Sequence, residues 1–436
     1  MITTAFVKIW GKTVGAVAWD QHSGLASFEY DPAFKNSGID LAPLTMPTNS
    51  GRNIFTFPNL RKKEDPDLDA FRGLPGLLAD SLPDNYGNQL INVWLAQQGR
   101  PQDSMNPVEK LCFIGERGMG ALEFEPAQLQ GNKRTFSIEV ESLVQLASQM
   151  LSRKEDFSAQ LDKEEEPGIR QILKIGTSAG GARPKAVIAY NDKTGEVRSG
   201  QTKAPNGFEH WLIKLDGVSD VQLGKTQGYG RVEMAYYLMA KDCGIEMMPS
   251  KLFEENGRAH FMTKRFDREG AETKHHIQTL CAIKHFDFND VLSYSYEQLF
   301  QAMRELRLTY PEAEQMFRRM VFNVAARNCD DHTKNFSFRL KEGEKWELAP
   351  AYDLCHAYRP ESEWVSQHSL SINGKRKEIT KGDLLAVAKS MNIKKAGAVI
   401  DEVNGVVAQW KTYAEKAGVD PELKKAIAKT LVDLSH

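Results

Sequence analysis

The chain has 436 residues, of which 41% are hydrophobic and 26% are charged, and its formal net charge at pH 7 is −2. This length exceeds what one hydrophobic core usually organises, so we expect two lobes or domains. The composition is typical of soluble globular proteins, and it excludes extensive disorder and wholesale wrapping of nucleic acid.

The five cysteines lie far apart and form no CxxC pair, which argues against a disulfide framework and a structural zinc site. The first 20 residues alternate like two strands around a Gly-Lys turn and lack the basic and apolar regions of an export signal. The sequence contains no run of 18 apolar residues, the length that a membrane-spanning helix needs. We therefore expect a cytoplasmic protein in a reducing compartment.

The first predicted elements form a small α+β segment. Residues 1–35 predict short strands, and residues 77–98 contain the helical pattern Leu90, Ile91, Trp94 and Leu95. Residues 152–168 are rich in charge and end in Pro-Gly, which predicts a flexible connection. A solvated helix face followed by a turn is the alternative for this stretch.

After this connection the pattern changes to strands and then to helices. AVIAY (residues 186–190) and HWLIKL (residues 210–215) predict two strands separated by a polar turn. Residues 232–243 carry apolar side chains at the spacing of one buried helix face. Residues 312–327 and 394–432 predict further helices, so the C-terminal half is expected to be a mostly helical lobe.

A glycine-rich segment is the first candidate for binding phosphate. Phosphoryl transfer requires a backbone cradle for phosphates, a strand lysine, Mg²⁺ ligands and a carboxylate near the acceptor hydroxyl. In IGTSAGGARPK (residues 175–185), Gly176, Gly180 and Gly181 let backbone N–H groups approach an anion closely. The segment is not a Walker A loop, because the order GxxxxGK[ST] is absent, and a ligand-free hairpin turn is the alternative.

Lys214 and Glu233 are candidates for an ion pair at the phosphates. Lys214 lies on a half-buried strand with apolar neighbours, and Glu233 opens the helix that follows. A strand lysine and a helix glutamate pair in this way in protein kinases. An edge lysine that reaches water and a solvated first-turn glutamate are the alternatives.

The segment RNCDDHTKNFSF (residues 327–338) carries the candidate base and a candidate metal ligand. Asp330 and Asn335 are five positions apart, as are the catalytic Asp and the metal-binding Asn of the kinase pattern HRDxxxxN. ELAPAYDLCHAY (residues 347–358) then supplies Asp353 as a second Mg²⁺ carboxylate. Each segment taken alone could be an ordinary turn, but the order of all these signals matches that of a kinase.

These residues resemble the HipA family of serine/threonine kinase toxins, which belong to toxin–antitoxin systems and whose fold is distantly related to protein and phosphoinositide kinases. The resemblance extends over nearly the whole chain. Its most specific segments are DDHTKNFSF and PAYDL, and it also includes FIGERGMGALEF, SAGGARPKA and MTKRFDR.

The resemblance implies roles for individual residues. Asp330 would be the catalytic base, Asn335 and Asp353 would hold Mg²⁺, and Ser178 would be a serine whose autophosphorylation ejects the glycine-rich loop and switches the kinase off. The residues expected to bind ATP are Gly180, Gly181, Ala182, Arg183, Pro184, Lys185, Lys214, Glu233, Lys264, Arg265, Phe266, His332 and Lys334, with Lys264, Arg265 and Phe266 at the adenine hinge.

The sequence departs from the family pattern at two places. Arg183 and Pro184 replace the glutamine and acidic residue that usually precede the loop lysine, which leaves details of nucleotide contact open. Asp331 stands where some members have glycine, so two adjacent carboxylates compete for the role of base, and the spacing to Asn335 favours Asp330.

The expected fold class is α+β: a protein-kinase-like two-lobed fold with an additional N-terminal α+β subdomain and a mostly helical C-terminal lobe. We expect an N-terminal subdomain over residues 1–125, a β-rich nucleotide-binding lobe over residues 126–268 and a helical catalytic lobe over residues 269–436.

The family also implies partners: ATP and Mg²⁺, a small helix-turn-helix antitoxin of the HipB type, operator DNA reached through the antitoxin, and a protein substrate such as an aminoacyl-tRNA synthetase. The basic stretch GKRKEITKGD (residues 374–383) could touch phosphates, although a solvated loop is the favoured interpretation. A lipid or small-molecule kinase and a catalytically silent corepressor are the alternative functions.

Overall fold

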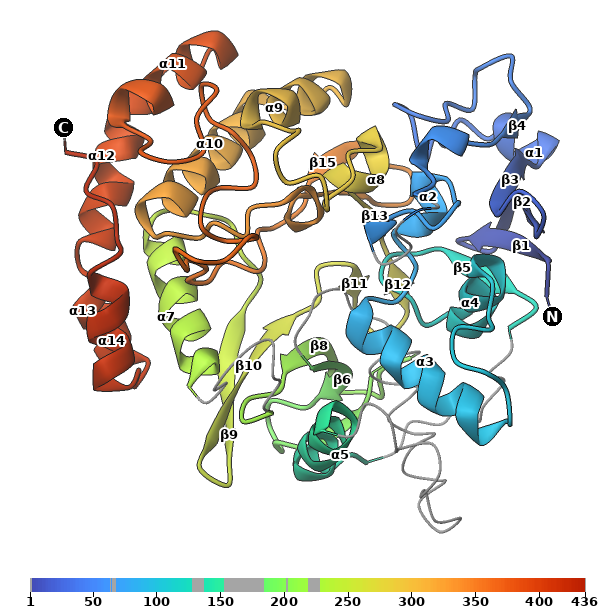
Figure 1. Cartoon of the computed structure of the whole chain (residues 1–436), viewed down its shortest axis with the longest axis horizontal. Coiled ribbons are helices and arrows are strands. Elements are labelled where there is room, and N and C mark those ends of the chain that lie inside the picture. Colours follow the sequence, from blue (N-terminus) through green and yellow to red (C-terminus); the bar gives the residue numbers. More distant parts are fainter. Residues whose placement is uncertain are drawn as a thin grey trace.

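The computed structural model describes residues 2–62, 64, 68–127, 137–152, 184–200, 203–218 and 228–435. It confirms the expected α+β class: an N-terminal α+β subdomain, a β-rich lobe and a mainly helical C-terminal lobe surround a common centre (Figure 1). In the part of the chain that is described, no helix is long and apolar enough to cross a membrane.

The N-terminal subdomain is built on a five-stranded antiparallel sheet in the order β4-β3-β2-β1-β5. One face of the sheet is apolar and packs on the helices of the subdomain, as the period-two alternation of its strands requires. Its elements are β1 (Thr4–Ile9), β2 (Lys12–Asp20), β3 (Leu25–Tyr30), β4 (Ile54–Phe55), β5 (Glu123–Glu125), α1 (Pro32–Lys35), α2 (Gly76–Ala79), α3 (Asn85–Gln97) and α4 (Pro107–Ile114).

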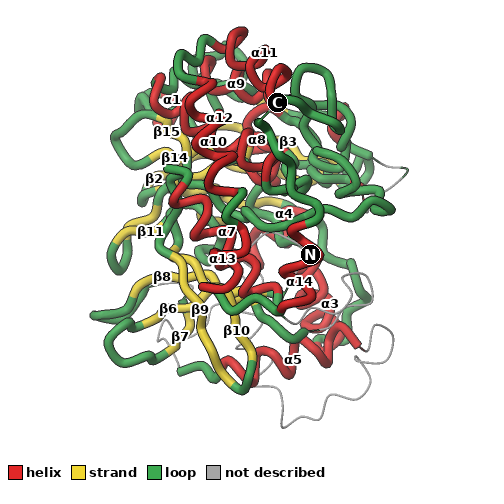
Figure 2. Tube along the Cα trace, turned by 90° about the vertical axis from the view of Figure 1, so that its left-hand side faces the viewer, coloured by secondary structure: helices red, strands yellow, loops and turns green. Residues whose placement is uncertain are grey.

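The second lobe contains another five-stranded antiparallel sheet, in the order β7-β6-β8-β10-β9. Its strands gather at the lower end of the molecule in Figure 2, with most of the helices above them. The elements are β6 (Lys185–Tyr190), β7 (Val197–Ser199), β8 (Glu209–Lys214), β9 (Ser250–Glu255), β10 (Arg258–Lys264), α5 (Val140–Ser152) and α7 (Tyr229–Asp242).

The apolar stripes of α5 and α3 form one core with alternate side chains of this sheet, including Ile188, Trp211 and Ile213. Helix α7 packs against β9 and β10 and also contributes Val232 and Tyr236 to the large core of the helical lobe. Helix α7 therefore lies at the junction of the sheet lobe and the helical lobe.

The C-terminal lobe is organised around α10, whose apolar stripe is fully buried among the neighbouring helices. A three-stranded sheet, β13-β14-β15, and the short hairpin β11-β12 connect this lobe to the rest of the molecule. The elements are β11 (Arg268–Glu269), β12 (Thr273–Lys274), β13 (His276–Thr279), β14 (Ser337–Leu340), β15 (Trp346–Leu348), α8 (Leu280–Lys284), α9 (Tyr296–Glu305), α10 (Tyr310–Ala325), α11 (Lys381–Met391), α12 (Ala396–Val407), α13 (Trp410–Lys416) and α14 (Pro421–Ala428).

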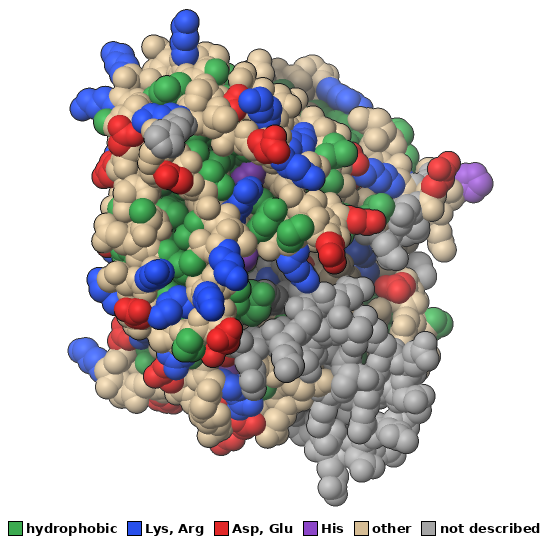
Figure 3. Space-filling view, turned by 60° about the vertical axis from the view of Figure 1, so that its left-hand side comes forward, with side chains coloured by type: hydrophobic (Ala, Val, Ile, Leu, Met, Phe, Trp, Pro, Cys, Tyr) green, Lys and Arg blue, Asp and Glu red, His purple; other side chains and the backbone are tan. Residues whose placement is uncertain are grey.

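The surface and the cysteines agree with the composition. On the face shown in Figure 3, basic and acidic side chains are interspersed, as expected for a net charge near zero. All five cysteines are free thiols, and four of them are buried.

Candidate functional site

Two lysines stand side by side on the second sheet. Lys185 of β6 and Lys214 of β8 are cross-strand partners, so their side chains leave the sheet on the same face. The Lys185 side chain is only 3% exposed, and that of Lys214 is 16% exposed. Neighbouring cations in such a buried place repel each other, so carboxylates nearby are needed to keep both charged.

Lys214 joins carboxylates from two different lobes. Its ammonium group donates hydrogen bonds to Glu233 of α7 and to Asp353, which follows β15. Burial alone would lower the pKa of Lys214, but Asp353 and Glu233 together raise it. Burial would likewise raise the pKa of Asp353, but the charges of Lys214 and Lys185 lower it to about 2. Lys214 and Asp353 are therefore both charged at neutral pH.

The backbone of Asp353 lies in a region that favours glycine, with φ of 53°. An aspartate held in this left-handed conformation costs free energy, and such residues cluster at functional sites. The order of Lys214, Glu233 and Asp353 in the sequence matched that of a kinase site, and in the structure the three side chains are in contact.

The loop between α10 and β14 presents Asp330 to solvent. Its side chain is 49% exposed, and its backbone carbonyl accepts a hydrogen bond of 2.6 Å from Nδ2 of Asn335. This bond fixes the Asn335 amide and leaves its oxygen as the remaining ligand atom. His332 Nε2 lies 3.8 Å from Asp330 Oδ1, and Lys334 Nζ lies 4.4 Å from the ring centre of Phe288.

Asp331 is unsuited to act as a base in this loop. Its side chain is fully buried and accepts hydrogen bonds from His368 Nδ1 at 2.8 Å, the Tyr296 hydroxyl at 2.9 Å and the backbone N–H of Ser369 at 2.7 Å. A carboxylate so enclosed cannot reach an acceptor hydroxyl. The geometry therefore favours Asp330, as the five-position spacing did.

At the expected adenine hinge, the charged side chains are paired within the protein, whereas Asp330 is exposed to solvent. The Arg265 guanidinium is 1% exposed and bonds both oxygens of Asp267, at 2.8 and 2.6 Å, so its side chain is committed to the interior. Phe266 stacks on Tyr352, and Lys264 pairs with Glu209 at 2.5 Å. The Arg265 backbone N–H donates to the carbonyl of His210 at 2.9 Å, so neither the side chain nor the N–H of Arg265 is available to a nucleotide base.

The donor set at Asp353 and Asn335 fits a hard cation. Mg²⁺ is usually held by one or two carboxylates and completes its shell with water and substrate phosphates. One carboxylate and one amide oxygen meet that requirement. Within the described ranges, no cluster of three or more His, Cys, Asp or Glu side chains forms an all-protein metal site.

Part of the predicted site lies outside the described residues: Ser178, Gly180, Gly181, Ala182 and Arg183. The expected connection over residues 152–168 also lies almost wholly outside them. Pro184 is buried, and its carbonyl accepts a hydrogen bond of 2.9 Å from the backbone N–H of Leu215, which fixes the chain just before Lys185.

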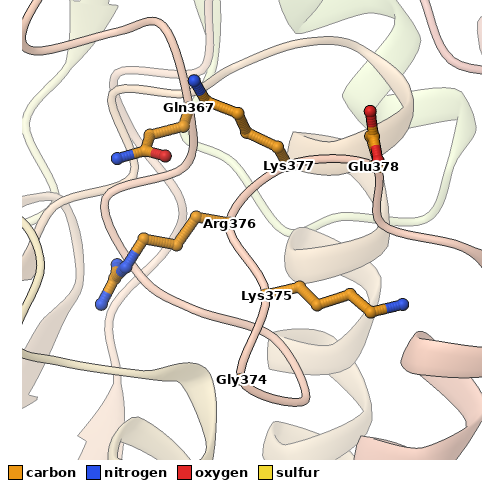
Figure 4. A pocket seen from close by; sticks show the side chains of 6 residues that line it. All are labelled: Gln367, Gly374, Lys375, Arg376, Lys377 and Glu378. Atoms are coloured by element: carbon orange, nitrogen blue, oxygen red, sulfur yellow. The ribbon is translucent and has the colours of Figure 1, made fainter.

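The basic stretch in the C-terminal lobe lines a shallow pocket, but its cations do not converge. In Figure 4 the side chains of Lys375, Arg376 and Lys377 point in three directions. Lys375 pairs with Asp383 at 2.9 Å, and Arg376 donates to the backbone carbonyls of Ser369 and Tyr294. These bonds give two of the three cations a role inside the lobe.

Sequence inspection missed one charged residue next to Lys185. Asp84, at the start of α3, places Oδ2 3.7 Å from the Lys185 ammonium. Its position after Leu-Pro and before a helical pattern suggests a helix cap but gives no sign of a partner 101 positions away.

Comparison with known proteins agrees with this architecture. Residues 5–125 match the family model of the HipA N-terminal domain, and residues 177–410, more than half of the chain, match that of the HipA-like C-terminal domain. No curated protein sequence matches the chain.

Among solved structures, HipA of the Shewanella oneidensis MR-1 toxin–antitoxin system, determined with HipB and operator DNA, superimposes with a TM-score of 0.64 at 18% identity. That match covers 98% of this chain and 94% of the other, and it shows a shared fold. The Helicobacter pylori proinflammatory kinase CtkA matches 58% of this chain and 92% of its own at a TM-score of 0.34 and 12% identity, too low to carry an argument. On the two family models, the chain belongs to the HipA family.

Proposed function

We propose that this chain is an ATP- and Mg²⁺-dependent serine/threonine protein kinase and the toxin of a toxin–antitoxin pair. The observation that carries the proposal is the convergence of Lys214, Glu233 and Asp353. A lysine held between a helix glutamate and a metal-binding aspartate is the arrangement that aligns ATP phosphates in kinases.

In the proposed reaction, Asp330 accepts the proton of the acceptor hydroxyl as that oxygen attacks the γ-phosphorus of ATP, and ADP leaves. The half-exposed carboxylate of Asp330 can meet a protein substrate, in contrast to Asp331. Lys185 and Lys214 would contact the phosphates, with His332 and Lys334 beside them. Residues 264–266 would border the adenine.

Asn335 and Asp353 would hold Mg²⁺, which when bound offsets the negative charge of the phosphates. The hydrogen bond from Asn335 to the Asp330 carbonyl would keep the metal ligand and the base in a fixed position relative to each other. Before the metal binds, Lys214 provides the positive charge that keeps Asp353 ionised.

Regulation and partners follow from family membership as part of the proposal. Phosphorylation of Ser178 would place a dianion in the glycine-rich loop and switch the kinase off. A HipB-type antitoxin would bind the toxin and its operator DNA, as in the Shewanella complex. The substrate would be a protein of translation, such as an aminoacyl-tRNA synthetase, and the setting the cytoplasm.

The test is intact-mass spectrometry of the dephosphorylated full chain after incubation with Mg²⁺ and ATP. We expect a gain of one phosphate that maps to Ser178 and that is absent in Asp330→Asn. Circular dichroism would establish that this variant, altered at a half-exposed side chain, is folded.

An unmodified wild-type chain that binds ATP but phosphorylates no protein would favour a lipid or small-molecule kinase. An Asp330→Asn variant with unchanged toxicity would favour a silent corepressor. Either result would overturn the proposed protein-kinase activity.

A further inference from the structure

The segment between α2 and α3 of the N-terminal subdomain is anchored on the helical lobe. Asp80, directly after α2, accepts hydrogen bonds from the backbone N–H of Thr279 at 2.7 Å and from its hydroxyl at 2.8 Å. Gly76 lies so close to α8 that a Cβ there would overlap the carbonyl oxygen of Ala282. These contacts fix the position from which α3 starts, near the centre of the molecule (Figure 1).

Asp84 uses its two oxygens differently. Oδ1 caps α3 by accepting a hydrogen bond of 2.6 Å from the backbone N–H of Gly87, and Oδ2 lies 3.7 Å from Lys185 Nζ. The Asp84 side chain is 9% exposed and that of Lys185 is 3% exposed. The anchored segment therefore brings a buried carboxylate from the N-terminal subdomain to the first residue of β6.

The Asp84 carboxylate opposes the effects of burial and of Lys214 on the charge of Lys185. Burial and the neighbouring charge of Lys214 both act to lower the pKa of Lys185, whereas Asp84 is the strongest opposing charge. Burial raises the pKa of Asp84 to about 6, against the effect of Lys185, which leaves it ionised at neutral pH. Lys214 has its own carboxylates in Glu233 and Asp353.

We propose that Asp84 is a positioning residue of the nucleotide site, which keeps Lys185 charged and directed so that it can bind ATP phosphates. The inference rests on the proposed function, because it assigns Lys185 to the phosphates. It makes the N-terminal subdomain a contributor to the ATP site, in addition to the strand lysine and its two carboxylates.

The test is calorimetric titration of the full-length protein with Mg·ATP and, separately, with adenosine. Asp84→Asn removes the charge but keeps the helix cap, because asparagine caps as well as aspartate does. Asp420→Asn is the matched control, since Asp420 caps α14 at an exposed position by accepting hydrogen bonds from Glu422 and Leu423 N–H groups at 2.9 and 3.2 Å. Asp84→Ser is a second neutral cap, should the asparagine variant fold poorly.

For Asp84→Asn we expect Mg·ATP affinity to fall about tenfold, the effect of weakening one charge-assisted phosphate contact. Adenosine affinity should stay within about twofold of wild type, because adenosine lacks phosphates, and Asp420→Asn should bind both ligands normally. In phosphoryl transfer, the KM for ATP should rise more than kcat falls.

Unchanged Mg·ATP affinity in both neutral variants would overturn the inference and leave the proposed function intact. An equal loss of adenosine and ATP affinity would overturn it as well, because it would indicate a structural role for Asp84. Failure of the wild-type protein to bind Mg·ATP would instead refute the proposed function itself.

Discussion

The buried pair of His368 and Asp331 is expected to be a major source of stability for the loop that carries Asp330. Both side chains are at most 1% exposed, and they meet at 2.8 Å. Behind them, Asn323 donates to the Tyr296 hydroxyl at 3.0 Å, and Tyr296 donates to Asp331 at 2.9 Å. The loop that carries Asp330 is thus held from behind by a buried polar network.

His368→Ala would leave the Asp331 carboxylate buried with two hydrogen bonds and without its hydrogen-bonded cation. Breaking a buried ion pair by removing one partner costs about 3–5 kcal/mol. We expect the free energy of unfolding to fall by about that amount. His368→Asn keeps a donor near the position of Nδ1 and fills part of the space, so it should cost about 1–3 kcal/mol less.

The stabilisation by the His368–Asp331 pair should decrease as the pH rises. Burial alone would lower the pKa of His368, but the charge and hydrogen bond of Asp331 raise it to about 10, above the ordinary 6.5. A raised pKa in the folded state means that the pair contributes fully below pH 6.5 and loses its contribution as the pH rises toward 10. The gap in stability between wild type and His368→Asn should therefore narrow from pH 6.5 to pH 10.

Urea unfolding followed by tryptophan fluorescence measures these differences. Lys377→Ala, at the exposed side chain of the neighbouring loop, is the control and should change the stability by less than about 0.5 kcal/mol. A His368→Ala variant as stable as wild type at pH 6.5 would refute the view that this pair is charged and holds the loop.

Three further predictions concern contacts between parts of the fold. Lys214→Met should reduce phosphoryl transfer about 100-fold or more, measured with radiolabelled ATP, because Glu233 and Asp353 lose their shared cation. Gly76→Ala should lower the free energy of unfolding by about 1–3 kcal/mol in urea titrations, because its methyl group would overlap the backbone of α8. Asp267→Asn should lower it by about 3–5 kcal/mol, because two buried arginines lose the carboxylate they share.

Each of these predictions has a matched control. Lys193→Met, Gly195→Ala and Asp192→Asn change the same residue types in the exposed β6–β7 turn. The two glycine variants lose stability for different reasons. Gly76→Ala creates a steric overlap, whereas Gly195→Ala only strains the backbone, because Gly195 has φ of 72° and open space around it. Lys214→Met, Gly76→Ala or Asp267→Asn variants that behave like wild type would contradict the importance of these contacts.

Residue patterns in the sequence were sufficient to place candidate site residues that lie within one strand or one helix. The alternation of HWLIKL predicted a strand, and β8 spans Glu209–Lys214 with Lys214 at its end. The helical pattern after residue 232 predicted the helix that carries Glu233, and α7 spans Tyr229–Asp242. Strand alternation and helix spacing determine which way a side chain points, so these two residues could be placed before any contact was known.

The sequence was silent where function depends on contacts between distant segments. Asp84 and Lys185 are 101 positions apart along the chain, and His368 reaches Asp331 from a loop without regular structure. No periodicity reports such pairs, because they are decided by how whole elements pack. For Arg265, the sequence showed a charged residue near the hinge but could not show that Asp267 two positions later binds its side chain.

Because each lysine pairs with carboxylates from other elements, the charges of the site depend on how these elements are packed together. Lys214 contacts Glu233 of α7 and Asp353 of the helical lobe, whereas Lys185 contacts Asp84 of the N-terminal subdomain. A shift of any one of these three parts would separate a buried cation from its carboxylate, at a cost of several kcal/mol. The positive charge that we propose to bind phosphates is therefore complete only when all three parts are docked, so we expect a partner that displaces any one of them to weaken ATP binding without contacting the nucleotide.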